Sequence, residues 1–334
     1  MSPIDMQEAL FYVKRDKSRV VCGLCPHECT IADGKRGICG VRDNQNGTLF
    51  ALTYERVASA QMDPIEKKPL YHFHPGSEIL SLGSVGCNFS CAFCQNWSLV
   101  TSPVPRTECT AADVVELIKK HSSIGVAYTY NEPFIWYEFL MVAGRAVKEA
   151  GFCNVLVTNG FINPEPLSEI LPIIDAMNID LKSMNDEFYK THCRGRLEPV
   201  LDTIRAASQS CLVEVTNLII PGHNDTDDDF QRLTDFIAEV DPDIPLHLSR
   251  YFPHRSFSAP PTPEDTMMRA LSISREKLNY VYVGNMRIKE GQDSFCPHCE
   301  SLLVKRSGYA TRSVGVIGNR CSSCGADVHF ITGV

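Results

Sequence analysis

Three cysteines in the stretch Cys87-Asn-Phe-Ser-Cys91-Ala-Phe-Cys94 have a spacing that suits the ligands of an iron–sulfur cluster. Four thiolates would close a [4Fe–4S] cluster and make it an electron carrier. Three thiolates leave one iron open to bind and polarise a small molecule, as a catalytic zinc site keeps an open position. The alternative is that these are three ordinary buried or zinc-binding cysteines. The triplet therefore predicts a reactive cluster held by Cys87, Cys91 and Cys94.

A second cysteine group lies near the N-terminus and comprises Cys22, Cys25, Cys29 and Cys39. The glycines and the proline among these residues predict tight knuckle turns. A short, glycine-rich knuckle favours zinc, and a second [4Fe–4S] cluster that relays electrons is the open alternative. His27 could replace one of the thiolates.

A third group, at the C-terminus, consists of two CxxC knuckles formed by Cys296, Cys299, Cys321 and Cys324. This pattern is that of a zinc ribbon. A closed site of four thiolates suits zinc, with iron in a rubredoxin-like site as the alternative. The remaining cysteines are isolated and are interpreted as small packing residues or surface thiols; they are Cys109, Cys153, Cys193 and Cys211.

The composition is that of a globular protein, with 44% hydrophobic and 22% charged residues in a chain of 334. Apolar runs long enough to span a membrane are missing, and the first residues do not resemble a signal peptide. A cytoplasmic location is therefore expected, and there cysteines stay reduced and bind metals. The net charge of −8 argues against non-specific nucleic-acid binding.

Elements that could position the cluster alternate along the chain from residue 78. Strands are expected at 79–82, 125–129, 154–158, 175–180, 212–220, 245–250 and 280–283. Helices are expected at 110–122, 133–150, 226–239 and 263–277. A further helix should begin at 164, and helical segments after the strand at 175–180 should continue to about 210. This alternation predicts an α/β fold with right-handed crossovers and a parallel sheet, of the partial (open) TIM-type (β/α)6-like kind. The expected domains are a Cys-rich metal-binding module with its lead-in (1–77), a core (78–285) and a zinc-ribbon-like module (286–334).

The CxxxCxxC spacing resembles the signature of the radical S-adenosylmethionine (SAM) enzymes, in the branch of the pyruvate formate-lyase activating enzyme. The wider layout resembles the AmmeMemoRadiSam system radical SAM enzymes, through CGLCPHEC, GICGVR, KKPLYHFHPG, CNFSCAFCQNW, YTYNEP, NIDLKSMNDEFY, IIPGHND and the terminal cysteine ribbon. The resemblance covers nearly the whole chain. It implies a radical SAM barrel over 78–285 and a [4Fe–4S] cluster that chelates SAM and, once reduced, releases a 5′-deoxyadenosyl radical.

The resemblance also assigns residues around SAM. Phe93 matches an aromatic position near the adenine, although a core aromatic is the alternative. Glu132 matches a glutamate that accepts hydrogen bonds from the SAM amino group. The family's two glycines before that glutamate are replaced here by Tyr130 and Asn131. The alternative for Glu132 is a helix N-terminal residue before Pro133.

Residues at the ends of later strands complete the predicted cofactor site. Thr158 and Asn159 end the third strand, and Asp180 and Lys182 end the fourth, on the same side of it. In the activating branch the matching Asp helps to hold a monovalent cation beside SAM, and the matching Lys lies near the methionyl end. A surface ion pair of little weight is the alternative. His247 is a candidate to bind the SAM carboxylate, and the alternative is a buried histidine with satisfied hydrogen bonds.

The hypothesis is therefore a radical SAM oxidoreductase that abstracts hydrogen from its substrate. The substrate could be a glycyl-radical protein, a small molecule, or a product of partner enzymes of the same system. A low-potential donor, flavodoxin or ferredoxin, would reduce the cluster. The alternatives are a non-catalytic iron–sulfur or zinc scaffold and an RNA-modifying radical SAM enzyme; the negative net charge counts against the latter.

Overall fold

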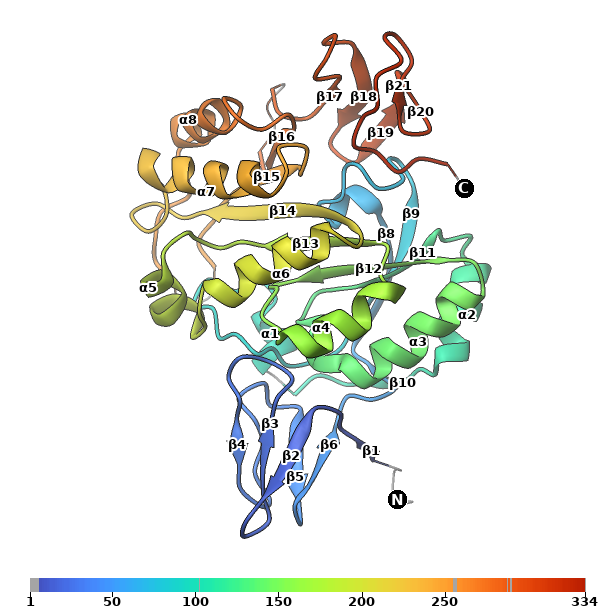
Figure 1. Ribbon diagram of the computed structural model, residues 1–334, viewed down its shortest axis with the longest axis vertical. Helices are drawn as coiled ribbons and strands as arrows, with labels where there is room; N and C mark the ends of the chain where they lie inside the picture. The colour runs from blue at the N-terminus through green and yellow to red at the C-terminus, as the bar shows by residue number, and fades with distance from the viewer. Residues whose placement is uncertain (1–5, 102, 255–256, 287, 289, 334) are drawn as a thin grey trace.

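An eight-stranded sheet forms the centre of the protein in the computed structural model, which describes residues 6–101, 103–254, 257–286, 288 and 290–333 (Figure 1). The strands, from one edge to the other, are β16 (Val281–Gly284), β15 (Leu246–Arg250), β14 (Leu212–Ile219), β13 (Ala176–Asp180), β12 (Cys153–Thr158), β11 (Gly125–Tyr128), β9 (Glu78–Gly83) and β8 (Ser59–Pro64). Every neighbouring pair from β9 to β16 is parallel, and β8 runs antiparallel to β9. The predicted α/β fold with a parallel sheet is confirmed, while its curvature into a partial barrel stays a prediction.

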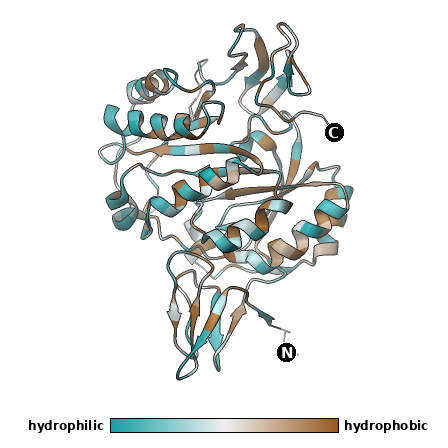
Figure 2. Cartoon of the chain, in the orientation of Figure 1, coloured by the Kyte–Doolittle hydropathy of each residue, from teal (hydrophilic) through white to brown (hydrophobic). Residues whose placement is uncertain are grey.

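Helices connect the parallel strands and cover the sheet (Figure 1). They are α1 (Trp97–Thr101), α2 (Ala111–Lys120), α3 (Tyr137–Glu149), α4 (Pro164–Ile170), α5 (Asp186–Phe188), α6 (Glu198–Ser208), α7 (Asp227–Val240) and α8 (Glu264–Ser274). Thr110 and Thr226 form capping boxes with Asp113 and Asp229, which start α2 and α7. Figure 2 shows apolar strands behind helices with polar outer surfaces, so the core lies between these two layers.

Three connections are less regular than a run of α-helices. The turn η2 (Pro133–Trp136) precedes α3, and η3 (Leu171–Ile173) follows α4. A π-helical turn, η4 (Tyr189–Cys193), follows α5 and ends at Arg194 in the left-handed conformation. This turn lies beside the cysteine loop after β9 and accepts hydrogen bonds from it.

Small sheets at the N-terminal end form a separate layer below the main sheet in Figure 1. One consists of β1 (Gln7–Glu8), β6 (Thr48–Ala51) and β5 (Arg42–Gln45), and the other of β2 (Tyr12–Arg15), β3 (Arg19–Cys22) and β4 (Thr30–Ile31). The strand β7 (Arg56–Val57) pairs with β10 (Thr107–Glu108). Because β8 belongs to the main sheet, the chain enters the core before residue 78; the domain boundaries themselves stay a prediction.

The C-terminal strands pack against the opposite side of the sheet. They are β17 (Ser294–Phe295), β18 (Leu302–Ser307), β19 (Ala310–Ser313), β20 (Val316–Ile317) and β21 (Arg320–Cys321). The Tyr282 hydroxyl hydrogen-bonds His72 Nε2 at 2.6 Å and also Ser294. Arg306 donates to Ser294 Oγ at 2.7 Å and to the Tyr71 carbonyl at 2.6 Å. The KKPLYHFHPG motif thus contributes a buried polar contact between the sheet and these strands.

Among the described residues, none of the helices has both the length and the apolar character needed to cross a membrane.

Candidate active site

A cavity of about 260 Å³ lies where the parallel strands end. Cysteines, carboxylates, amides and a lysine from five connections line it. Ten of the predicted cluster and cofactor residues are among them: Cys87, Cys91, Phe93, Cys94, Asn131, Glu132, Thr158, Asn159, Asp180 and Lys182. The carboxyl ends of parallel strands meet at one edge, which is why residues far apart in sequence converge here.

The cysteine loop is held by backbone hydrogen bonds to η4. Ser90 N–H donates to the Cys193 carbonyl at 2.9 Å, and Ala92 N–H donates to the His192 carbonyl at 3.0 Å. Gly195 fits against this loop because a Cβ there would lie 2.2 Å from the Phe89 ring. Cys193, interpreted from the sequence as a small packing residue or a surface thiol, is fully buried, and it also hydrogen-bonds the Cys91 thiol.

Glu132 connects the ends of two neighbouring strands. Its Oε1 accepts hydrogen bonds from the Thr158 hydroxyl at 2.7 Å and from Phe134 N–H at 3.0 Å, and Oε2 accepts from Asn159 N–H at 2.8 Å. Burial raises the pKa of Glu132 to about 7, against the opposing effect of these hydrogen bonds. The bond to Phe134 is the helix-capping contact considered from the sequence. A carboxylate oxygen can accept two hydrogen bonds, so Oε2 retains capacity for a donor in the cavity.

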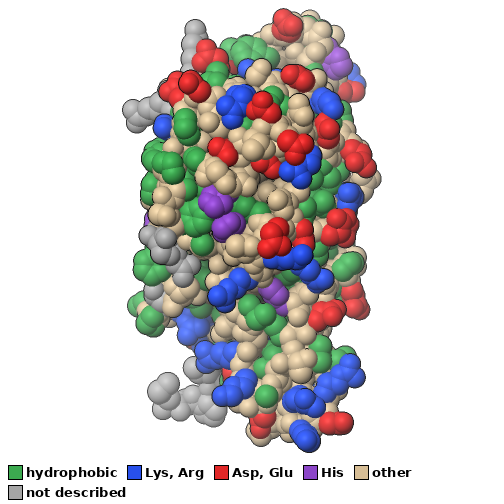
Figure 3. All heavy atoms as spheres, turned by 90° about the vertical axis from the view of Figure 1, so that its left-hand side faces the viewer, with side chains coloured by type: hydrophobic (Ala, Val, Ile, Leu, Met, Phe, Trp, Pro, Cys, Tyr) green, Lys and Arg blue, Asp and Glu red, His purple; other side chains and the backbone are tan. Residues whose placement is uncertain are grey.

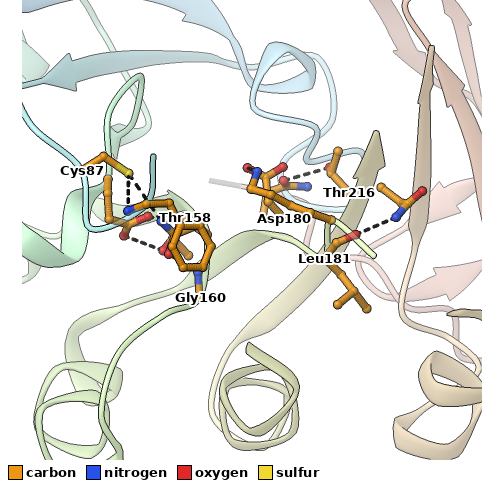
Figure 4. Close-up of polar contacts among 12 residues, drawn as sticks. Cys87, Thr158, Gly160, Asp180, Leu181 and Thr216 are labelled. Atoms are coloured by element: carbon orange, nitrogen blue, oxygen red, sulfur yellow. Dashed lines mark hydrogen bonds and ion pairs between the residues drawn. The ribbon is translucent and has the colours of Figure 1, made fainter. Parts of the chain in front are cut away.

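Asn131 supports the segment that leads into the cysteine loop. Its Oδ1 accepts from Ser84 N–H at 2.9 Å, and its Nδ2 donates to the Gly86 carbonyl at 3.2 Å. Asn159 Nδ2 lies 3.6 Å from Cys87 Sγ, a contact drawn in Figure 4 beside Thr158. The amides therefore position the loop as well as lining the cavity.

Asp180 and Lys182 form the charged side of the cavity. Lys182 Nζ lies 3.0 Å from Asp180 Oδ2 and 6.0 Å from the centre of the Phe93 ring. Burial would lower the pKa of Lys182, but the negative charges of the neighbouring Asp180 carboxylate and Cys91 thiolate raise it well above its usual value. The Asp180 side chain is 37% exposed, so its carboxylate is accessible from the cavity. The pair can hold a zwitterionic ligand by its two charged ends.

His247 is the one predicted cofactor residue that does not line the cavity. It is buried, with Nε2 2.6 Å from Glu214 Oε2 and its ring against Tyr71. Lining residues that the sequence did not single out include Gln95, Asn96, Thr129, Ser249 and Asn285. Four of them follow the end of a strand or the last cysteine of the loop, a signal that is too general to select them from sequence, whereas Ser249 lies within β15.

The four C-terminal cysteines form a metal-binding site. Their sulfur atoms all lie within 4.8 Å of one another, with separations of 3.8 Å for Cys296–Cys324 and 3.7 Å for Cys299–Cys321. Tetrahedral zinc with Zn–S bonds of about 2.3 Å places its sulfurs about 3.8 Å apart. The spacing is that of one tetrahedral ion, and we propose zinc as that ion.

Replacing Cys296 by serine is expected to remove about one zinc ion per chain, because a structural site needs all four thiolates. Metal content by mass spectrometry, together with a thermal melt, measures the loss. Cys211→Ser is the matched control, since Cys211 is partly buried and lies outside the ribbon. Unchanged zinc and iron in Cys296→Ser would contradict the assignment.

Comparisons with known proteins identify relatives of this chain. Residues 82–237 match the family model of the radical SAM superfamily. The chain is 42% identical to an uncharacterized protein of Methanocaldococcus jannaschii, MJ0808, over 98% of this chain and 100% of that protein. It is 28% identical to the Escherichia coli pyruvate formate-lyase 1-activating enzyme, over 46% of this chain and 66% of the enzyme. A crystallised domain of a pyruvate-formate lyase-activating enzyme from Bacteroides vulgatus has 22% identity and a TM-score of 0.43, over 48% of this chain and 99% of that chain.

Residues 82–237 therefore form a region of the radical SAM superfamily, and activating enzymes are among the relatives of the chain. Membership implies a [4Fe–4S] cluster and SAM. Three thiolates facing one cavity, beside polar groups that can bind an amino acid moiety, fit that pair of cofactors. The finer assignment to the AmmeMemoRadiSam system stays a prediction.

Proposed function

We propose that this protein is a radical SAM oxidoreductase that cleaves SAM reductively and abstracts hydrogen from its substrate. The observation that carries the proposal is the convergence of Cys87, Cys91 and Cys94 with Glu132 and Asp180 in one cavity. When bound there, the reduced cluster supplies the electron that cleaves SAM into methionine and a 5′-deoxyadenosyl radical.

The protein's own residues would bind and orient SAM. Phe93, which is 3% exposed, gives an apolar wall for the adenine and excludes water from the reducing centre. Glu132 Oε2 would accept from the SAM amino group, and Lys182 would face its carboxylate. Asp180 would hold Lys182 in place and offer an oxygen to a monovalent cation.

The test is anaerobic reconstitution with iron and sulfide, reduction with dithionite, and assay of 5′-deoxyadenosine. We expect product only when SAM, the cluster and the reductant are all present. A chain that binds its iron but forms no 5′-deoxyadenosine would contradict the proposal and favour a non-catalytic scaffold.

Replacing Asp180 by alanine is expected to weaken SAM binding about tenfold, close to 1.4 kcal/mol. Lys182 would lose the carboxylate that orients it, and any bound cation would lose a ligand. Equilibrium dialysis of the reconstituted protein with labelled SAM, with and without potassium, measures the change. Asp202→Ala is the control, because Asp202 lies on the surface of α6 and, within the described part of the chain, forms an ion pair with Arg205 alone. An unchanged affinity in Asp180→Ala would remove Asp180 from the site.

For the substrate we propose a glycyl-radical protein. Relatives carry names such as isethionate sulfite-lyase activating enzyme and 4-hydroxyphenylacetate decarboxylase activating enzyme, matched over 54% and 44% of their lengths. A small molecule, or a product of partner enzymes, is the competing class. Incubation with a candidate lyase followed by electron paramagnetic resonance (EPR) would distinguish them, since only a protein substrate yields a glycyl-radical signal. We place the reaction in the cytoplasm, with flavodoxin or ferredoxin as the donor.

A further inference from the structure

The four N-terminal cysteines line one enclosed cavity beside the cysteine loop. Its wall is otherwise mostly apolar, with Arg42 and His27 as its polar side chains. The lining residues are Cys22, Leu24, Cys25, His27, Cys29, Ile31, Gly37, Ile38, Cys39, Arg42 and Ile135. The sequence left two metals open here, zinc or a second [4Fe–4S] cluster.

Sulfur separation distinguishes the two metals. A single zinc ion draws its thiolates to about 3.8 Å from one another. A cubane spreads its ligands farther, because each thiolate binds a different iron at a different corner. Among the described residues, the ribbon cysteines alone bring three or more metal-ligand atoms within 4.8 Å of one another. No three of the N-terminal cysteine sulfurs lie that close to one another, although they line one cavity, and the same holds for the sulfurs of Cys87, Cys91 and Cys94.

Hydrogen-bond donors surround these sulfurs, as the sulfurs of an iron–sulfur site require. Backbone N–H groups of His27, Ile38 and Val41 face Cys25, Cys29 and Cys39 respectively. Arg42 Nη1 lies 3.8 Å from Cys22 Sγ.

The Arg42 side chain is itself buried, at 1% exposed, and its Nη2 is paired with Glu138. Its Nε has no hydrogen-bond partner among the described residues. A buried guanidinium on the cavity wall with an unused donor fits an anionic occupant, and a [4Fe–4S] cluster with four thiolates is anionic.

This cavity also adjoins the loop of the first cluster. His27 Nε2 lies 2.8 Å from the carbonyl oxygen of Asn88, the residue after Cys87. Gly86, at φ +82°, packs so closely that a Cβ there would lie 2.6 Å from the Cys39 carbonyl oxygen. The N-terminal cysteine site therefore contacts the residues immediately before and after Cys87, which is a ligand of the first cluster.

We propose that Cys22, Cys25, Cys29 and Cys39 bind a second [4Fe–4S] cluster that passes electrons to the first. The binding of this cluster stands on the geometry above, whereas its role as a relay rests on the proposed function. One electron from a reduced low-potential protein takes this cluster from the 2+ to the 1+ state. The same electron then moves to the cluster at Cys87, Cys91 and Cys94, and the relay returns to 2+ with no bond made or broken.

The exposed surface of this module suits an acidic electron donor. Figure 3 shows Lys and Arg side chains gathered over the lower part of the molecule, where the N-terminal strands lie. The exposed ones include Lys14, Arg15, Lys17, Lys35 and Arg36. Although the chain as a whole carries −8, a local positive surface can steer an acidic partner to this end.

Iron content and EPR test the cluster without reference to activity. In Cys87→Ala/Cys91→Ala/Cys94→Ala we expect about four iron atoms per chain to remain, with a reduced [4Fe–4S] signal that does not respond to SAM. In Cys25→Ser/Cys39→Ser we also expect about four iron atoms per chain, now in the cluster held by Cys87, Cys91 and Cys94, with a signal that does respond to SAM. Cys109→Ser, a change outside all three cysteine groups, should keep both clusters. Two zinc ions in the wild type and an iron-free triple variant would overturn the proposal.

The relay is tested by the choice of reductant. For Cys25→Ser/Cys39→Ser, the ratio of 5′-deoxyadenosine formed with reduced flavodoxin to that formed with dithionite should fall about tenfold or more. An unchanged ratio would overturn the relay while leaving the cluster in place. If the wild type binds both clusters but forms no 5′-deoxyadenosine with either reductant, the proposed function fails and the iron count still decides the second site.

Discussion

Replacing Cys91 by alanine is expected to reduce 5′-deoxyadenosine formation on the order of a thousandfold or more. Cys91 is the central thiolate of the loop, buried at 9% exposed and hydrogen-bonded by Cys193. With two thiolates left, a cubane loses the attachment that fixes its open iron toward the cavity. The measurement is product formation over a fixed time with dithionite, together with the iron content of the reconstituted protein.

Cys109→Ala is the matched control for this variant. Cys109 is also buried, at 7% exposed, but it lies after β10 and away from the cavity. It should keep its iron and form product at a rate close to that of the wild type. Equal product from Cys91→Ala and the wild type would contradict the whole assignment of the cluster, whatever the metal content.

Replacing Asp63 by asparagine is expected to lower the free energy of unfolding by about 3–5 kcal/mol. Asp63 accepts from Lys67 Nζ and Lys68 Nζ, both at 2.6 Å, and from the Tyr130 hydroxyl. Lys68 is 2% exposed, so the variant leaves a buried ammonium group without its counter-charge. Tyr130 precedes Asn131 with φ +72°, and the cavity should therefore lose its alignment as well.

The effect of Asp63 should depend on pH in a defined direction. Burial raises the pKa of this carboxyl, but the hydrogen bonds from Lys67, Lys68 and Tyr130 outweigh it and lower the pKa below its ordinary value. The carboxylate therefore stabilises the protein fully above the unfolded pKa of about 3.9, and this stabilisation is lost as pH falls from there through the folded pKa. The difference between wild type and Asp63→Asn should be constant from pH 6 to 8 and shrink below about pH 4.

Urea unfolding at pH 7 and at about pH 3 measures both effects. Lys67→Met is the control, since Lys67 is 46% exposed and its ion pair should contribute about 1 kcal/mol or less. If Lys67→Met and Asp63→Asn cost the same, the buried charge of Lys68 is not what Asp63 compensates.

Much of the fold follows from local patterns in the sequence. The strands that alternate with helices from residue 78 appear in order in the sheet, because a parallel strand needs a crossover and successive crossovers place it next to the previous one. The helix at 133–150 begins instead with a 3-10 turn at Pro133–Trp136. The role of β8 as an antiparallel edge strand was not evident, because its sequence alternates weakly and its partner lies across a loop.

Part of the candidate site could be predicted from the sequence in the same way. Residues such as Asp180 and Lys182 follow a strand directly, and a parallel sheet brings all such residues to one edge. His247 lies within β15 and faces Glu214 on the neighbouring strand, so its ring takes part in a buried hydrogen bond. A strand pattern gives the side on which a residue lies but not the partner that it meets there.

The sequence by itself identified the three cysteine groups and predicted a reactive cluster for one and a metal ribbon for another, because the spacing of Cys87, Cys91 and Cys94, and of the two C-terminal knuckles, is a local property of the chain. Only the tertiary structure decided how far apart the sulfurs lie. Ribbon sulfurs 3.7–3.8 Å apart suit one ion, whereas no three of the N-terminal sulfurs lie within 4.8 Å of one another around their small cavity. Those separations depend on how distant segments pack, with Gly86 against Cys39 and His27 against Asn88, and no spacing along the chain encodes them.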